Sequence, residues 1–345
     1  MTQAVFLANA LNNGVCESPA EANLVQLVLR LSDAGKDISA LVARGALEGA
    51  MHSVTGENAD GDVQKILDLR VHDLMMKALG VGGVAAVASE EADEPVILDE
   101  TAPYVVAMDP LDGSSNIETN TAIGTIFAIL PRGDLSPAEA LLQPGRRQVA
   151  AGFMLYGPQT IFALTLGWGT QTYTLDPCSG EFMQTSAAMR VPEATQEYAI
   201  NASNARHWDA AIREYIDDCI AGEDGPRGKN FNTRWVAAVV ADAFRILVRG
   251  GIYLYPGDRR RGYTDGRLRL TYEANPLAFL VEQAGGKATN GARPILDIEP
   301  ASVHQRVPLI FGSADEVDRV GRYLATSPFD GDRSPLFAER SLFRA

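Results

Sequence analysis

The chain has 345 residues, which is enough to bury a large core and to divide into two domains. A hydrophobic content of 46% is ordinary for a globular protein, and no apolar run is long enough to span a membrane. The net charge of −14 argues against a general binder of nucleic acid or anionic membranes, so an anionic substrate would need a local basic cluster. The three scattered cysteines lack metal-ligand spacing, which favours reduced thiols in a cytoplasmic protein.

The first part of the chain is predicted to be helical. Residues 20–47 carry apolar side chains at helical spacing, and a second helix is expected from Val63 after a polar, glycine-flanked loop. Asp62 and Asp68 would lie about 120° apart on one continuous helix, so they can serve one site only if Asp62 belongs to the loop. Otherwise Asp62 is a helix N-cap and Asp68 is a solvated charge.

Two apolar strands are each followed by acidic residues. Ala85–Ala88 leads to Glu90 and Glu91, and Tyr104–Met108 leads to Asp109. A glutamate pair after a strand is usually only the start of an exposed loop. Neighbouring strands can, however, deliver carboxylates to one edge of a sheet, which is a common way to build a metal site.

The octet Asp109–Asn116 (Asp-Pro-Leu-Asp-Gly-Ser-Ser-Asn) is the most informative stretch. Pro110 ends the strand and spaces two carboxylates, Asp109 and Asp112, that suit Mg²⁺. The small residues after them leave backbone N–H groups open to an anion. A cation beside an anion site is what phosphate-ester hydrolysis requires, whereas a bare acidic turn would only cap the next element.

The remainder of the chain changes character near Val191-Pro192. Residues 121–190 read as β-rich, and the second half alternates strands with helices, including one expected from Trp235 to Val248. These patterns predict an N-terminal domain over 1–191 and a C-terminal domain over 192–335. The basic loop Asp258–Tyr263 either attracts the anionic substrate to the site or is an exposed hairpin tip. The hairpin tip is the simpler interpretation for its first three arginines.

A period of two over Arg267–Glu273 predicts a strand with Arg267, Arg269 and Glu273 on one face. Asn275-Pro276 is a helix start, N-cap then first turn. Glu273 is therefore expected at a strand end just before a helix N-terminus, which suits a phosphate and metal site.

Taken together, these stretches resemble the class I fructose-1,6-bisphosphatases among the metal-dependent, lithium-sensitive sugar phosphatases. The matching stretches, besides the octet, are Gly61-Asp62, Ser89–Glu91, Leu141–Arg146, Gly250–Pro256 and Leu268–Gly286. The resemblance implies an α/β (α+β) fold in αβαβα layers, with two domains and mixed sheets flanked by helices. It also implies a homotetramer that hydrolyses the 1-phosphate of fructose 1,6-bisphosphate, in gluconeogenesis or the Calvin cycle.

The resemblance assigns roles to individual residues. The ligands of two or more Mg²⁺ ions per subunit, with Mn²⁺ as a candidate substitute, would be Glu90, Asp109, the Leu111 carbonyl, Asp112 and Glu273. The residues that activate the attacking water would be Asp62, Asp68 and Glu91. The 1-phosphate and sugar would meet Asp112, Gly113, Ser114 and Ser115. The 6-phosphate would meet Asn201, Tyr255, Arg267 (usually lysine) and Arg234, the last from a neighbouring subunit.

The chain also departs from the family pattern. Asn204 and Trp235 stand where the family often has 6-phosphate-binding tyrosines. Three motifs that meet the phosphate of the inhibitor AMP in many members are altered, and the altered positions are Glu21–Val25, Pro103 and Pro131, with Arg132 one residue away. We therefore expect no inhibition by AMP. Two other functions stay open, an inositol-monophosphatase-like phosphatase and a catalytically inactive regulator that binds sugar phosphates.

Overall fold

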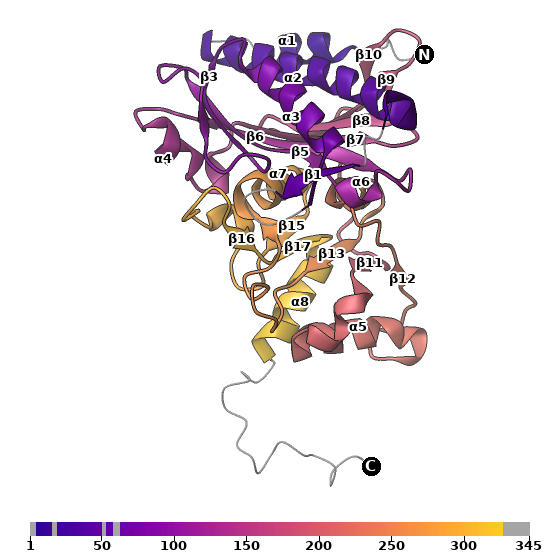
Figure 1. Ribbon diagram of the computed structural model, residues 1–345. Coiled ribbons are helices and arrows are strands. Elements are labelled where there is room, and N and C mark those ends of the chain that lie inside the picture. The colour runs from indigo at the N-terminus through magenta and orange to yellow at the C-terminus, as the bar shows by residue number, and fades with distance from the viewer. Residues whose placement is uncertain (1–4, 16–18, 50–52, 58–62, 327–345) are drawn as a thin grey trace.

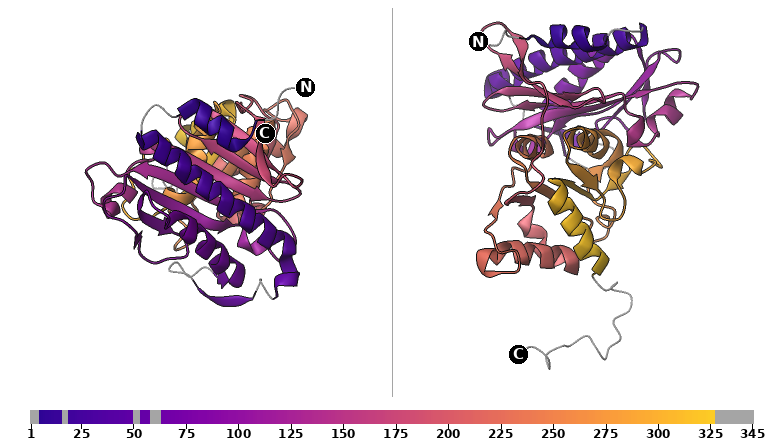
Figure 2. Two further views of the ribbon diagram at one scale, coloured as in Figure 1. Left: turned by 90° about the horizontal axis from the view of Figure 1, so that it is seen from above. Right: turned by 180° about the vertical axis from the view of Figure 1, so that it is seen from behind.

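The computed structural model describes residues 5–15, 19–49, 53–57 and 63–326. These residues form alternating layers of helix and sheet, αβαβα, as Figures 1 and 2 show from three sides. The predicted fold class is confirmed. In the described part of the chain, no helix has the length and apolar character needed to cross a membrane.

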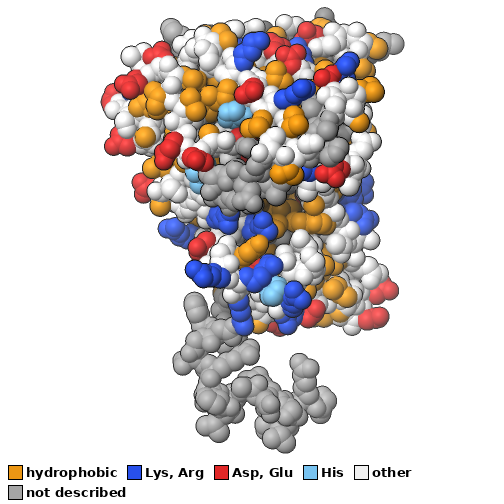
Figure 3. All heavy atoms as spheres, viewed as in Figure 1, with side chains coloured by type: hydrophobic (Ala, Val, Ile, Leu, Met, Phe, Trp, Pro, Cys, Tyr) orange, Lys and Arg blue, Asp and Glu red, His pale blue; other side chains and the backbone are white. Residues whose placement is uncertain are grey.

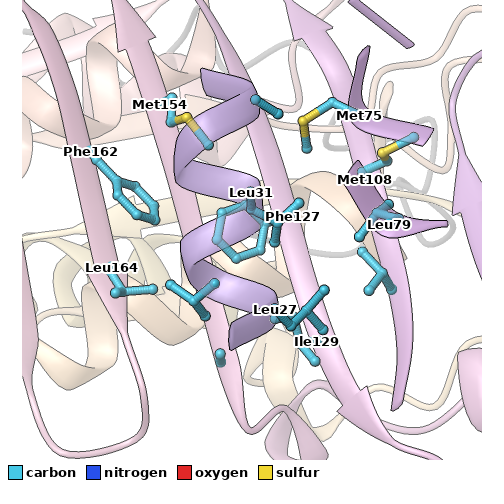
Figure 4. Close-up of a cluster of buried hydrophobic side chains, with 14 of the residues drawn as sticks. Leu27, Leu31, Met75, Leu79, Met108, Phe127, Ile129, Met154, Phe162 and Leu164 are labelled. Atoms are coloured by element: carbon cyan, nitrogen blue, oxygen red, sulfur yellow. The ribbon is translucent and has the colours of Figure 1, made fainter. Parts of the chain in front are cut away.

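The first layer is helical and consists of α1 (Leu7–Val15), α2 (Pro19–Arg44) and α3 (Ile66–Leu79). The predicted helix over 20–47 is thus confirmed up to Arg44. Leu27 and Leu31 of α2 are fully buried and face Phe127 and Met154 of the sheet below, as Figure 4 shows. This apolar face holds the layer on the sheet because burying each such side chain contributes about 1.5–3 kcal/mol.

The second layer is a mixed sheet of eight strands among the described residues, in the order β10-β9-β8-β7-β6-β5-β3-β4. Its strands are β3 (Val84–Ser89), β4 (Val96–Ile97), β5 (Tyr104–Asp112), β6 (Ile123–Pro131), β7 (Ala150–Tyr156), β8 (Thr160–Thr165), β9 (Thr170–Asp176) and β10 (Glu181–Ser186). Strands β3 and β5 pair in parallel. The residues that follow β3 therefore reach the same edge as the end of β5, as the sequence predicted.

Helices α6 (Val239–Arg249) and α7 (Asn275–Gln283) form the middle layer. Val240 and Leu277 share one apolar core with Phe153 of the first sheet and Phe311 of the second. Because helices from the second half of the chain cover both sheets, the two halves are tightly joined, and the division at residue 191 stays a prediction.

The last two layers belong to the second half of the chain. The second sheet has the order β12-β11-β13-β17-β15, with β11 (Glu197–Ile200), β12 (Asn232–Thr233), β13 (Ile252–Tyr255), β15 (Lys287–Thr289) and β17 (Leu309–Gly312). Its outer face carries α5 (Ala210–Ile220) and α8 (Ala314–Thr326). Smaller elements are the hairpin β1 (Val54–Glu57) and β2 (Val63–Lys65), α4 (Pro137–Leu141), and the pair β14 (Leu268–Arg269) and β16 (Arg306–Val307).

Pro110 does not end its strand, contrary to the prediction. Strand β5 continues to Asp112, and its register against β6 is irregular between Asp109 and Asp112, where a proline without an N–H is tolerated.

Two further predictions of local structure were wrong around the site. The strand expected to reach Glu273 ends at Arg269, and residues 270–274 form a π-helical turn. Leu270, Thr271 and Tyr272 are all buried, so the segment has no solvent face and its alternating pattern does not report a strand. Asn275 consequently continues this turn as the first residue of α7 and is not its N-cap.

The helices expected to begin at Val63 and Trp235 both begin later. Residues 63–65 pair as β2, and α3 starts at Ile66. Helix α6 starts at Val239, because Ala237 has a φ of 64° and the helix cannot extend through this left-handed residue.

Candidate active site

The octet begins with the last four residues of β5 and turns at Gly113 into a short 3₁₀ helix (Ser114–Asn116), and this turn packs against the residues at the start of α6. Gly113 has a φ of 79°, and a Cβ at this position would lie 2.5 Å from the Cβ of Ala238. The side-chain amide of Asn116 donates to the carbonyl of Val236 at 3.1 Å. The carboxylate of Asp112 accepts the backbone N–H of Val240 at 2.9 Å. These contacts place Asp112 against the N-terminus of α6.

Three carboxylates converge beside this turn. The side chains of Asp109, Asp112 and Glu273 each offer an oxygen, and these oxygens lie within 4.8 Å of one another. Their exposed fractions are only 2%, 9% and 7%. Glu90 lies beside this cluster, because its backbone N–H donates to the carbonyl of Met108, the neighbour of Asp109, at 3.2 Å. Burial and then the charge of Glu90 raise the pKa of Asp109 well above its usual range. The structure thus brings together four of the five predicted metal ligands.

The fifth predicted ligand is the carbonyl of Leu111, which lies in the same turn. The N–H of Leu111 donates to Asp109 at 2.9 Å and fixes that carboxylate in the last residues of β5. The ligand role of the carbonyl itself stays a prediction.

The residues of this cluster fit a divalent cation. Burial and the charge of Glu90 raise the pKa of Glu273, and the backbone N–H and charge of Arg269 oppose this rise. Buried carboxylates that repel one another are destabilising unless a cation or protons compensate them. Several converging carboxylate oxygens are the donor set that hard cations such as Mg²⁺, Ca²⁺ and Mn²⁺ prefer.

A second acidic group lies on the side of α3. Asp68 is 2% exposed, so the alternative of a solvated charge is wrong. One of its oxygens accepts the N–H of Lys65 at 2.7 Å, and the other has no hydrogen-bond partner in the described part of the chain. Burial raises the pKa of Asp68 to about 7, and the charge of Glu91 adds to this rise. Asp68 and Glu91 are therefore close together, whereas Asp62 lies outside the described residues.

Two residues near the site were missed by the sequence analysis. The ammonium group of Lys65, the residue just before α3, donates to the carbonyl of Ser114 at 2.9 Å and so links the start of α3 to the octet. Asp242 of α6 is 2% exposed, and burial raises its pKa to about 7, with a contribution from Asp112. No local pattern marks either residue, because both resemble ordinary charged residues near a helix start.

A second pocket lies at the end of β13. Its lining includes Asn201, Asn204, Tyr255, Asp258, Tyr263 and Arg267. Burial raises the pKa of Tyr255, and the charge of Arg267 opposes this rise. Lys and Arg side chains gather on the lower half of this face of the molecule, as Figure 3 shows. The structure thus brings together three of the four predicted 6-phosphate residues.

Arg234, the fourth of these residues, is not among those that line this pocket in its own chain. It is exposed, and one guanidinium nitrogen donates to the carbonyl of Thr233 at 2.8 Å. Trp235 stacks on Tyr253, with ring centroids 5.5 Å apart, and lies beside Tyr255. Ser114 and Ser115 follow Gly113 in a short 3₁₀ turn at the acidic cluster, with Ser115 exposed.

A buried carboxylate cluster that fits a cation, together with a pocket lined by Arg267 and polar side chains, is the arrangement expected of a metal-dependent sugar phosphatase. Two family models match the chain, the N-terminal domain of fructose-1-6-bisphosphatase over residues 8–187 and the C-terminal domain over residues 191–325. The chain therefore belongs to the fructose-1,6-bisphosphatase family, as its sequence motifs indicated, and is a phosphoric monoester hydrolase. This family is metal-dependent and binds a sugar bisphosphate.

Similar proteins support the assignment over the whole chain. The class 1 fructose-1,6-bisphosphatase of Acidiphilium cryptum is 53% identical over 348 residues, which cover 100% of this chain and 98% of that protein. The class 1 enzyme of Sinorhizobium medicae is 50% identical, with 100% and 99% covered. The crystal structure of Leishmania major fructose-1,6-bisphosphatase in holo form superposes with a TM-score of 0.87 at 31% sequence identity. The matched region covers 93% of this chain and 99% of the Leishmania major chain.

Proposed function

We propose that this enzyme hydrolyses the 1-phosphate of D-fructose 1,6-bisphosphate with Mg²⁺ as its cofactor. The observation that carries the proposal is the buried cluster of Asp109, Asp112 and Glu273, whose oxygens converge within 4.8 Å. With Glu90 beside them, these groups would hold the metal ions. When bound, Mg²⁺ supplies positive charge to the transferring phosphoryl group and lowers the pKa of water.

The chain's own groups would orient the substrate and move the proton. Asp68 has one buried oxygen with no partner among the described residues and a pKa near 7, which suits a group that takes a proton from the attacking water near neutral pH. Glu91 is close enough to raise that pKa. Asp62 is proposed for the same role on sequence alone. Backbone N–H groups at Gly113–Ser115 would receive the 1-phosphate.

We further propose that the pocket of Asn201, Tyr255 and Arg267 binds the 6-phosphate in a homotetramer. Arg234 would complete this pocket from a neighbouring subunit. Its exposed position outside the pocket of its own chain supports this assignment, because a residue that served its own pocket would line it.

Insensitivity to AMP is the proposed regulatory property. Glu21 lies near Tyr104, since it contributes to the raised pKa of that phenol. This supports the proposal, because an AMP phosphate bound there would meet an acid in place of donors. The guanidinium of Arg132 donates to the carbonyls of Ala102 at 2.8 Å and Leu135 at 3.0 Å, and is thereby committed to its own loop. Losing two charge-assisted contacts costs about 3–6 kcal/mol, which turns micromolar binding into millimolar or weaker.

The cytoplasm is the proposed location. The proposal rests on the scattered cysteines, which lack metal-ligand spacing and favour reduced thiols; of these, Cys178 is exposed and Cys219 is buried. Gluconeogenesis and the Calvin cycle are both compatible with the proposed reaction.

Phosphate release decides between the candidate functions. Fructose 1,6-bisphosphate and inositol 1-phosphate are each supplied with and without Mg²⁺. We expect rapid release from the bisphosphate only, and only with Mg²⁺. Preference for inositol 1-phosphate would indicate the inositol-monophosphatase-like alternative, and tight binding of the bisphosphate without any release would indicate an inactive regulator.

A further inference from the structure

The loop after β13 folds one of its arginines back onto the second pocket. The Nε of Arg260 lies 3.0 Å from each carboxylate oxygen of Asp258, and its Nη2 contacts that carboxylate as well. The same Nη2 donates to the side-chain oxygen of Asn204 at 3.0 Å. The guanidinium also lies over the ring of Tyr263, at 4.3 Å from the centroid. Arg260 is therefore not a residue of an exposed hairpin tip, which was the simpler expectation for it.

The contacts of Arg260 neutralise the negative charge of Asp258, an acid that lines the pocket. The side chain of Asp258 is only 6% exposed and lies among the lining residues, where a carboxylate would repel a phosphate. The contacts from Arg260 hold the pKa of Asp258 below its usual range, so the acid is ionised and paired. Arg267 lies over the same Tyr263 ring at 4.9 Å from its centroid, so the two guanidinium groups and the phenol form one unit at the pocket.

The contact with Arg260 also orients the side chain of Asn204. A guanidinium has donors only, so the amide must turn its oxygen toward Arg260 and its NH₂ group away. Within the described residues this NH₂ group makes no hydrogen bond, although Asn204 lines the pocket. The amide thus offers two unpaired donors at the position where the family often has a tyrosine hydroxyl.

We propose that Arg260 is a positioning residue for the distal phosphate of the substrate, because it neutralises Asp258 and turns the amide of Asn204 so that its NH₂ group donates to that phosphate. This inference rests on the proposed function. It assigns Asn204 as the contacting residue and explains how an acidic residue is tolerated in an anion pocket.

Arg260→Met tests the proposal, with Arg261→Met as the matched control. Arg261 is exposed, and its substitution removes the same positive charge from the same loop. Arg260→Met should raise KM for fructose 1,6-bisphosphate about 10-fold or more with little change in kcat, because the charge-assisted contacts act on a group remote from the reacting bond. With fructose 1-phosphate, which lacks the distal phosphate, the two variants should have equal kinetic constants.

A second substitution separates positioning from mere folding. Adding Asp258→Asn to Arg260→Met removes the unpaired acid, so KM for the bisphosphate should fall by about 3-fold or more from the single variant. If Arg260→Met does not fold, Arg260→Lys takes its place. Lysine keeps the charge near Asp258, but one ammonium nitrogen replaces both Nε and Nη2 and cannot reproduce the fixed geometry by which they hold Asp258 and Asn204 together, so KM should still rise about 3-fold.

Three results would overturn the inference. The first is a KM of Arg260→Met within 2-fold of the Arg261→Met value. The second is a rise in KM for fructose 1-phosphate equal to the rise for the bisphosphate. The third is no fall in KM for the bisphosphate when Asp258→Asn is added. If the wild-type enzyme releases no phosphate from the bisphosphate, the proposed function fails instead. Calorimetric binding of fructose 6-phosphate to the wild type and Arg260→Met then still decides the role of Arg260.

Discussion

Gly113→Ala is expected to damage both the stability of the enzyme and its active site. Gly113 adopts a left-handed φ of 79°, and a new methyl group would lie 2.5 Å from the Cβ and 3.2 Å from the Cα of Ala238. Ala238 immediately precedes α6, and the N–H of Val240 in that helix binds the carboxylate of Asp112. Any shift that relieves the contact therefore moves Asp112.

The loss in the free energy of unfolding of Gly113→Ala has two parts. A left-handed conformation costs an alanine about 1–2 kcal/mol. Overpacking against a backbone that cannot move freely costs about 1–3 kcal/mol more. Gly285→Ala is the matched control, because Gly285 has a φ of 85° with no atom within 4 Å of the added methyl group. It should show the conformational part alone.

Thermal unfolding and phosphate release measure the two effects. Each kcal/mol lowers Tm by about 2–4 °C in a chain of moderate size, so Gly113→Ala should unfold several degrees below Gly285→Ala. It should also lose at least about 10-fold in kcat, while the control keeps its activity. Equal Tm values together with full activity of Gly113→Ala would refute the packing argument.

Four further predictions follow from the site. Asp109→Asn and Glu273→Gln should each lower kcat by about 10²–10³, while Asp134→Asn, which neutralises an exposed acid, should not. If Asp109→Asn or Glu273→Gln kept half of the wild-type activity at low Mg²⁺, that residue would not be a metal ligand. Arg234→Ala should raise KM before it lowers kcat, and mixed tetramers with Asp109→Asn subunits should regain activity, a recovery that would not occur if the arginine acts within its own chain. Without metal at pH 7, Asp112→Asn should be more stable than the wild type by up to about 3 kcal/mol, because burial raises the pKa of Asp112 from 3.8 to about 6. Urea unfolding should show this stability difference appearing as pH rises from about 4 to 6 and vanishing below pH 4. Saturating Mg²⁺ should reverse the difference, because it binds the folded wild type. AMP titrated at limiting Mg²⁺ should give no half-inhibition below about 0.1 mM, whereas inhibition below that level would mean that the altered phosphate contacts still bind AMP.

The sequence by itself determined the parts of the site that lie at strand ends. The apolar run before Asp109 and the glutamates after the strand that ends at Ser89 are local signals of two buried strands followed by polar residues, although β5 continues through Pro110 to Asp112. The parallel pairing of β3 and β5 then brings Glu90 and Asp109 to one edge. The αβαβα class followed from the resemblance that these same residues carry.

Only the tertiary structure decided how distant groups meet. Glu273 reaches the cluster from a π-helical turn buried on every side, so its alternating pattern predicted the wrong element. Lys65 contacts Ser114, which is 49 residues away, and Arg260 contacts Asn204, which is 56 residues away. Such contacts leave no periodic signal in the chain, because packing between layers, and not local conformational preference, selects which side chains are brought together and which charges are buried.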